Sequence, residues 1–109
     1  MKRRIAGWVL AGCCAALPAM AEEMPALGKK GNCTPCHDVD AAPGKPKLGP
    51  IFREVAKKYR GQADAEKMLM DRIAKGGGGK WGNAVMPPSS PALSEVDTKS
   101  LAQYILSLK

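Results

Sequence analysis

The chain has 109 residues, and its 17 Lys and Arg against 10 Asp and Glu give a formal net charge of +7. This length suits one domain and excludes two. Three of the basic residues lie within the first four positions, so the remainder carries only +4, a mild excess that falls well short of a nucleic-acid-binding signature.

The first 21 residues have the pattern of a secretory signal peptide. A positive start is followed by an apolar run over 5–17, and Ala19-Met20-Ala21 supplies small residues for cleavage. The run is too short to cross a bilayer, so we expect no transmembrane segment. We therefore divide the chain into a signal peptide, 1–21, and one domain, 22–109, exported to a bacterial periplasm.

A second cleavage signal overlaps the first. Leu10-Ala11-Gly12-Cys13 resembles a lipoprotein cleavage box, which would leave Cys13 as a lipidated N-terminus. The segment before Cys13 is short for an export signal, and a good site follows at Ala21. We therefore favour cleavage after Ala21, with a lipid-anchored form through Cys13 as the alternative.

Four segments of the domain have helical patterns. The clearest is 63–75, where acidic residues fall in the first turn, apolar residues recur along one side and a glycine ends the pattern. Further helices are expected over 24–31, over 51–59, and after the capping-box-like Ser94-Glu95-Val96-Asp97. Pro and Gly mark 38–50 as a loop, and 76–92 is irregular by composition. No segment has a strand pattern, so we predict a small all-α domain of about four short helices with long loops.

Cys33-Thr34-Pro35-Cys36-His37 is the attachment signature of a c-type haem. Two thiols three positions apart can add to the two vinyl groups along one porphyrin edge, and the adjacent histidine then lies within reach of the iron. A thioredoxin-like pair needs a βαβ context, and structural zinc needs four ligands, whereas this domain has a single histidine. A plain disulfide would leave His37 without a role. The motif therefore predicts one haem c, covalently bound through Cys33 and Cys36, with His37 binding its iron.

The iron needs a second axial ligand or an open site, and the domain has no other histidine. Met24 lies shortly before Cys33, and Met68 and Met70 lie on a predicted helix, where packing is the better explanation. Met86 lies in an irregular segment and precedes two prolines, which stiffen the backbone and remove two N–H donors. A rigid loop carrying a thioether suits an iron–sulfur bond, so we favour Met86 as the second ligand.

Further motifs follow the cysteine motif in a fixed order. They are Gly49-Pro50, Asp71-Arg72-Ile73 before a glycine run, and Trp81-Gly82-Asn83-Ala84-Val85-Met86-Pro87-Pro88. This order resembles the small bacterial class I cytochromes c of the monohaem c-551/c-552 type, over essentially the whole domain. The resemblance implies a small class I cytochrome c fold wrapped around one haem. It also implies thioether bonds from Cys33 and Cys36 and axial ligation by His37 and Met86.

The resemblance assigns three more residues to the haem site. The carbonyl of Pro50 would accept a hydrogen bond from His37, which fixes the ring and its tautomer. Arg72 and Trp81 would bond a buried haem propionate. Independently, an arginine and an indole N–H form a suitable donor pair for a carboxylate that has left water. Core filling is the simpler alternative for Trp81.

Two departures from the family pattern affect these expectations. The stretch from His37 to Pro50 is longer than usual and carries Lys45 and Lys47, so its conformation cannot be carried over. Ser89 stands where relatives often have an asparagine whose amide supports the methionine sulfur. A shorter hydroxyl would support the sulfur less.

Histidine and methionine in both axial positions leave no site for oxygen or peroxide, so the iron changes only its valence. We therefore expect a monomeric electron-transfer protein, not an enzyme. Its expected partners are a quinol-oxidising complex as donor and a terminal reductase or oxidase as acceptor. The alternatives are a dedicated haem subunit of a larger oxidoreductase and a small haem peroxidase with a dissociable Met86.

Contact with partners is expected near the haem edge. By resemblance, that edge lies among Pro35, Ala84 and Val85. Lysines in the segments that flank the two ligand motifs are candidates for steering acidic partners, and they are Lys29, Lys30, Lys45, Lys47 and Lys80.

Overall fold

The computed structural model describes residues 12, 22–41, 44 and 46–109. Its elements, in chain order, are α1 (Ala26–Lys30), α2 (Phe52–Tyr59), α3 (Ala65–Lys75), β1 (Gly77–Gly78), β2 (Val85–Met86) and α4 (Glu95–Ser107). The four predicted helices are therefore present, close to their expected bounds. The predicted signal peptide, the alternative lipidation site at Cys13 and the loop residue Lys45 lie outside the described residues. None of the described helices is long and apolar enough to cross a membrane.

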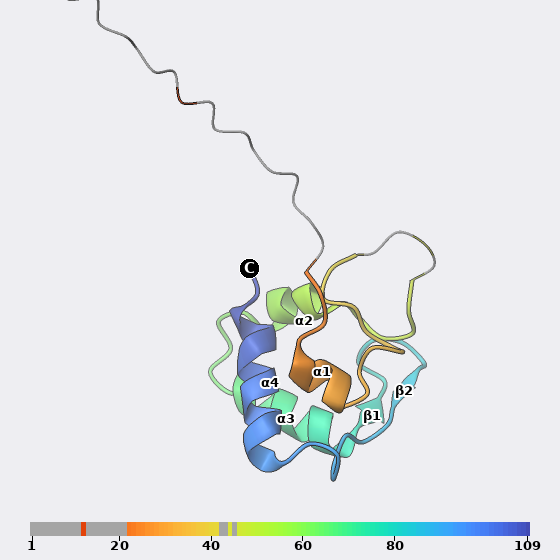
Figure 1. The fold of residues 1–109 in the computed structure, drawn as a ribbon. Coiled ribbons are helices and arrows are strands. Elements are labelled where there is room, and N and C mark those ends of the chain that lie inside the picture. The colour runs from red at the N-terminus through yellow and green to blue at the C-terminus, as the bar shows by residue number, and fades with distance from the viewer. Residues whose placement is uncertain (1–11, 13–21, 42–43, 45) are drawn as a thin grey trace, which may run out of the picture.

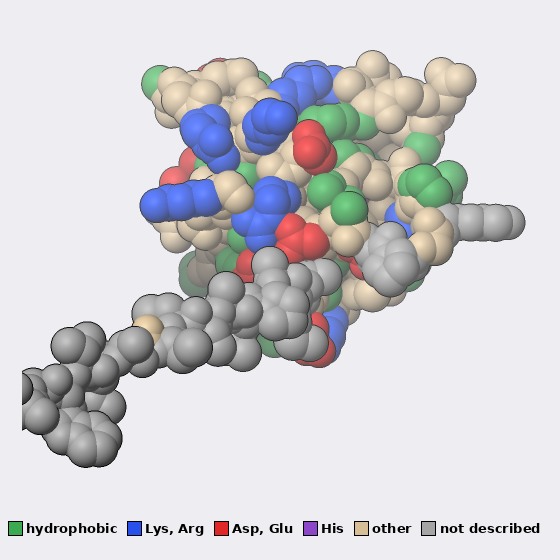
Figure 2. Space-filling model, turned by 90° about the horizontal axis from the view of Figure 1, so that it is seen from above, with side chains coloured by type: hydrophobic (Ala, Val, Ile, Leu, Met, Phe, Trp, Pro, Cys, Tyr) green, Lys and Arg blue, Asp and Glu red, His purple; other side chains and the backbone are tan. Residues whose placement is uncertain are grey.

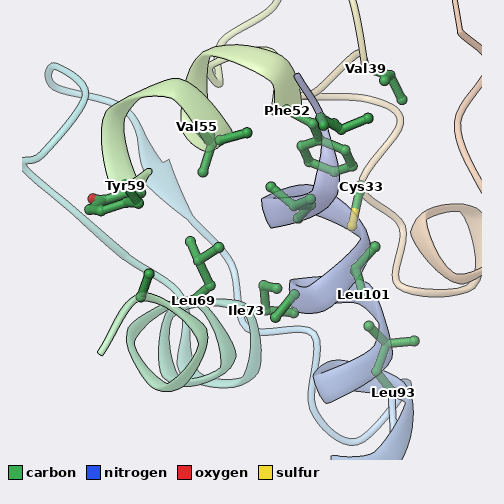
Figure 3. Close-up of a cluster of buried hydrophobic side chains, with 14 residues drawn as sticks. Cys33, Val39, Phe52, Val55, Tyr59, Leu69, Ile73, Leu93 and Leu101 are labelled. Carbon is green, nitrogen blue, oxygen red and sulfur yellow. The ribbon is translucent and has the colours of Figure 1, made fainter. Parts of the chain in front are cut away.

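Helix α4 is the element on which the other helices pack, and its Leu101 and Ala102 are completely buried. In Figure 1 it lies on one side of the domain, with β1 and β2 on the other. In Figure 3 the side chains of Val55 from α2 and Leu69 from α3 extend into the space between these helices. The core therefore joins α2, α3 and α4 through apolar side chains that recur with the helical period.

Helix α4 begins as the sequence predicts. The side chain of Ser94 accepts a hydrogen bond from the main-chain nitrogen of Asp97, at 3.1 Å. This bond satisfies one of the N–H groups that the first turn of a helix leaves unpaired.

The two short strands are the one element that the sequence pattern does not predict. They form an antiparallel ladder in which Gly77 lies opposite Met86 and Gly78 opposite Val85. Two residues are too few to show the alternation of polar and apolar side chains that identifies a strand. Gly76, with a φ of 71°, allows the close approach, because a Cβ there would collide with the carbonyl oxygen of Met86.

Candidate haem site

A large cavity lies among α2, α3, α4, the two strands and the cysteine motif. Its volume is about 1090 Å³, slightly above the range of roughly 300–1,000 Å³ for ligand pockets. All the residues predicted to hold the haem contribute to its wall, namely Cys33, Cys36, His37, Pro50, Arg72, Trp81 and Met86. Val55, Leu69 and Ile73 make parts of the wall apolar. A large, mainly apolar group with polar edges therefore fits this cavity, and it would complete the core of a small domain.

Helix α1 ends in a Schellman motif, and the last residue of this motif is Cys33. The N–H of Cys33 bonds to the carbonyl of Gly28 at 2.9 Å, and the N–H of Asn32 bonds to that of Lys29 at 3.1 Å. Asn32 has a φ of 56°, a left-handed conformation that asparagine adopts more readily than most residues. The motif leaves Cys33 buried, and burial, followed by the neighbouring Cys36, raises the pKa of its thiol.

Segment 33–37 forms a single helical turn. The N–H groups of Cys36 and His37 both bond to the carbonyl of Cys33, at 3.1 and 2.9 Å. The turn brings both thiols and the imidazole to the cavity wall, and the two cysteines are free rather than joined in a disulfide. In the part of the chain that the structure describes, no group of three His, Cys, Asp or Glu side chains could hold a metal ion.

The ring of His37 is fixed by contacts on several sides. Its Nδ1 lies 2.7 Å from the carbonyl oxygen of Pro50. Because a carbonyl can only accept, Nδ1 carries the proton and Nε2 keeps an electron pair for a metal. The centroid of the Phe52 ring lies 5.3 Å from that of His37. Gly49 packs so closely that a Cβ would lie 2.8 Å from Nδ1 of His37.

Lys47 fastens the long loop to the cysteine turn. Its Nζ lies 2.6 Å from the carbonyl oxygen of Thr34, 2.8 Å from Oδ1 of Asp38 and 3.4 Å from the carbonyl oxygen of His37. A cation is favourable at the carbonyl end of a helical turn. The sequence does not predict these contacts of Lys47, because its partners lie about ten residues away along the chain and form no local pattern with it.

Met86 is positioned by the strand ladder and by the segment that follows it. It lies opposite Gly77 in the ladder, and its half-buried side chain contributes to the same cavity wall as His37. After the two prolines, the N–H of Ser89 bonds to the carbonyl of Ile73 at 3.0 Å, which attaches the segment to α3. The backbone on both sides of Met86 is therefore held by hydrogen bonds.

The side chain of Ser89, which stands where relatives often have asparagine, bonds to the main chain. Its buried hydroxyl lies 3.4 Å from the carbonyl oxygen of Gly31. It therefore links the segment after Met86 to the end of α1.

Two other methionines reach the cavity. Met68 and Met70, both half-buried on α3, contribute to its wall, whereas Met24 packs against Gly28 in α1. Met68 and Met70 therefore offer two further thioethers in the wall to which Met86 contributes.

Arg72 and Trp81 lie in the wall near the glycine-rich segment. The guanidinium of Arg72 packs against Gly77, where a Cβ would collide with Nη1. Trp81 is 41% exposed, so it does not fill the core, and Nζ of Lys58 lies 4.4 Å from its ring centroid. Lys58 was not predicted, because nothing local in the sequence connects α2 with Trp81. An arginine and an indole N–H in the same cavity wall suit a carboxylate-bearing ligand.

The family model for cytochrome c matches residues 22–109. The chain belongs to the cytochrome c family. Cytochrome c-552 of Hydrogenobacter thermophilus is 45% identical to this cytochrome c over 83 residues, 76% of this chain and 79% of that protein. Cytochrome c-551 of Pseudomonas aeruginosa is 40% identical over 91 residues, 84% of this chain and 82% of that protein.

A solved structure shows the same relationship in three dimensions. The crystal structure of wild-type Nitrosomonas europaea cytochrome c552 superposes with a TM-score of 0.68 at 40% identity, covering 76% of this chain and 96% of that one. The predicted c-551/c-552 type and the mostly helical fold are therefore confirmed. This cytochrome c is an electron-transfer protein with a covalently bound haem c, and Cys33 and Cys36 are the cysteines of its attachment motif.

Proposed function

We propose that this cytochrome c is a periplasmic one-electron carrier whose haem iron is bound by His37 and Met86. It would take electrons from a quinol-oxidising complex and pass them to a terminal reductase or oxidase in respiration. The observation that carries the proposal is that His37 and Met86 contribute to one cavity wall together with both cysteines. Both ligands come from segments fixed by main-chain hydrogen bonds, so little rearrangement is needed when the charge of the metal changes.

When bound, the haem supplies an iron that alternates between the ferrous and ferric states. Nε2 of His37 and the thioether of Met86 would hold the iron, and with both bound, oxygen and peroxide would find no place on it. Methionine ligation favours the ferrous state and raises the reduction potential. Arg72 and Trp81 would bond a propionate, and Lys58 lies over the indole ring of Trp81. The apolar side chains of the wall would limit the access of water to the bound group.

Apolar side chains at the cavity offer a contact surface for redox partners. Val85 and Leu48 are 77% and 75% exposed, Ala84 is also exposed, and all three contribute to the cavity wall. A small apolar contact of this kind suits the weak, short-lived encounters of electron transfer. We therefore assign partner contact to Leu48, Ala84 and Val85.

Charged residues around this contact would steer the partner. Lys30 lies 2.7 Å from Oδ2 of Asp97, and Lys47 is bound to the cysteine turn, so neither is well placed for steering. Lys29 and Lys80 are exposed. Steering is therefore assigned to Lys29 and Lys80. Figure 2, which looks from above Figure 1 onto the side of α2, also shows a group of Lys and Arg side chains on that face.

The carrier role is tested by mixing the reduced holoprotein with candidate terminal reductases and oxidases and following its reoxidation. With an acidic acceptor the rate should fall as salt rises, because the Debye length shrinks from about 10 Å at 0.1 M to about 3 Å at 1 M. Charge reversal at Lys29 and Lys80 should flatten this dependence, while reversal at Lys109 should change it less. Permanent association with one oxidoreductase, or peroxide turnover by the wild-type protein, would contradict the role of a free carrier.

The periplasmic location is tested by the intact mass of the native protein. A mass equal to residues 22–109 plus one haem supports export and cleavage after Ala21. A lipid-modified species that begins at Cys13 would instead place the carrier on a membrane surface.

A further inference from the structure

We propose that Asp40 and Arg53 form a binding site for the α-ammonium group that cleavage after Ala21 creates at Glu22. The inference rests on the export and cleavage proposed above. The main-chain nitrogen of Glu22 lies 2.8 Å from Oδ2 of Asp40. In an uncleaved chain this nitrogen is a neutral amide donor. Cleavage turns it into a cation at hydrogen-bond distance from a carboxylate.

Arg53, in the first turn of α2, holds the Asp40 carboxylate in place. Its Nε donates to Oδ1 of Asp40 and its Nη2 lies 3.2 Å from Oδ2, so the two side chains form a two-armed pair. The hydrogen bond from Arg53, followed by the one from the main chain of Glu22, lowers the pKa of Asp40. The carboxylate is therefore ionised and oriented before the α-ammonium group forms.

The side chain of Glu22 is bound by the same cluster. The hydroxyl of Tyr104, from α4, donates to Oε1 of Glu22 at 2.9 Å, and Nη2 of Arg53 lies 3.5 Å from Oε2. Nη1 of Arg53 also donates to the main-chain oxygen of Lys109, at 2.6 Å. The cluster thus joins the start of the domain to the loop after His37, to α2 and to the last residue of the chain.

The charges of this cluster are unequal until cleavage occurs. Among the described residues, Asp40 and Glu22 contribute two carboxylates, and Arg53 is the cation that contacts both. An α-ammonium group at Glu22 would be the second cation, located where the structure already provides an acceptor. Removal of the leader would therefore stabilise the folded domain, and the precursor would lack this contribution.

The first test compares holoproteins that differ by one residue at the N-terminus. One begins at Glu22 and the other retains Ala21, which moves the α-ammonium group one residue away, and each is made with Asp40 and with Asp40→Asn. With Asp40, retention of Ala21 should lower the folding equilibrium constant roughly two- to five-fold, the range expected for a partly exposed ion pair. With Asp40→Asn, retention should have no effect.

Asp71→Asn is the matched control. Asp71 forms a surface ion pair with Lys75, so this variant loses such a pair at another place and should keep the full effect of Ala21. An equal penalty for Ala21 with Asp40 and with Asp40→Asn, or no penalty with Asp40, would overturn the proposal.

The second test measures the pKa of the Glu22 α-ammonium group from the pH dependence of its reaction with an amine reagent. Its ordinary value is about 7.7–8.0, and the neighbouring carboxylates should raise it. The stability contributed by the pair of the α-ammonium group and Asp40 would then be fully present at pH values below the ordinary pKa. It would be lost as the pH rises through the raised pKa. The charged and titratable side chains gathered around this α-ammonium group are those of Asp40, Arg53, Glu22 and Tyr104. The pKa of Tyr104 is raised to about 12, mainly by burial, so its titration stays separate.

The pKa should be higher in the wild-type holoprotein than in Asp40→Asn, and equal values would overturn the site. The intact mass of native protein reports the cleavage position independently. A failed export proposal and a failed site are therefore distinguishable.

Discussion

Replacing Gly49 with alanine should displace the ring of His37. A Cβ at this position would lie 2.5 Å from Cε1 and 2.8 Å from Nδ1 of the ring, and 2.9 Å from the carbonyl oxygen of Cys36. The N–H of Gly49 bonds to that same carbonyl at 2.8 Å, which holds the two backbones together. The imidazole must therefore move, with a smaller shift of the backbone at Cys36 or Gly49, and the bond of the ring to Pro50 would be lost.

The expected loss in the free energy of unfolding of Gly49→Ala has two parts. Overpacking in a filled site costs about 1–3 kcal/mol, and a lost hydrogen bond costs about 0.5–1.5 kcal/mol. Together they predict a loss of roughly 2–4 kcal/mol, or roughly 10–30 °C in Tm for a domain of this size. The reduction potential should change as well, because the moved ring is the proposed iron ligand.

Thermal unfolding and redox titration of the holoprotein measure both effects, with Gly61→Ala as the control. Gly61 has a φ of 82° and no atom within 4 Å of a Cβ, so alanine there adds only backbone strain, about 1–2 kcal/mol. It should leave the potential unchanged. A Gly49→Ala protein with wild-type Tm and potential would refute this account of how His37 is held.

Three further predictions concern stability. Ser89→Ala removes the hydroxyl partner of the Gly31 carbonyl and should cost about 1 kcal/mol in urea unfolding; an unchanged midpoint would mean that this bond contributes nothing. Leu101→Ala empties a completely buried site and should cost about 2–5 kcal/mol, and a loss below 1 kcal/mol would contradict its place in the core. Arg53 lowers the pKa of Asp40, so their pair stabilises the fold above the ordinary carboxyl value of 3.8, and this contribution is lost as pH falls through the lowered pKa. Asp40→Asn should flatten the acid limb of the stability curve, and an unaltered limb would exclude the pair as its source.

The sequence predicts those parts of the site that local spacing determines. The cysteine motif is a single turn, so five consecutive residues specify two thiols and an imidazole in one place. The prolines after Met86 indicate a rigid segment, and the structure shows that segment anchored to α3. The bond between His37 and Pro50 was expected from family resemblance alone, and the two atoms lie at the distance such a bond requires.

The sequence does not predict contacts between segments that are distant along the chain. Lys47 holds the cysteine turn, Lys58 covers Trp81, and Asp40 pairs with Arg53, yet none of these pairs shares a helical or strand period. Such contacts depend on how the long loop and α2 pack, and only the folded chain brings them together.

The central claim is that Met86 binds the iron, and the ferric spectrum tests it most directly. The wild-type protein should show the red charge-transfer band of an iron–sulfur bond. Met86→Ala should lose that band, lower the potential and make the haem reactive toward peroxide. Met68→Ala, which removes another sulfur from the same cavity wall, should keep the band. A Met86→Ala protein that remains low-spin with the band and an unchanged potential would contradict the claim.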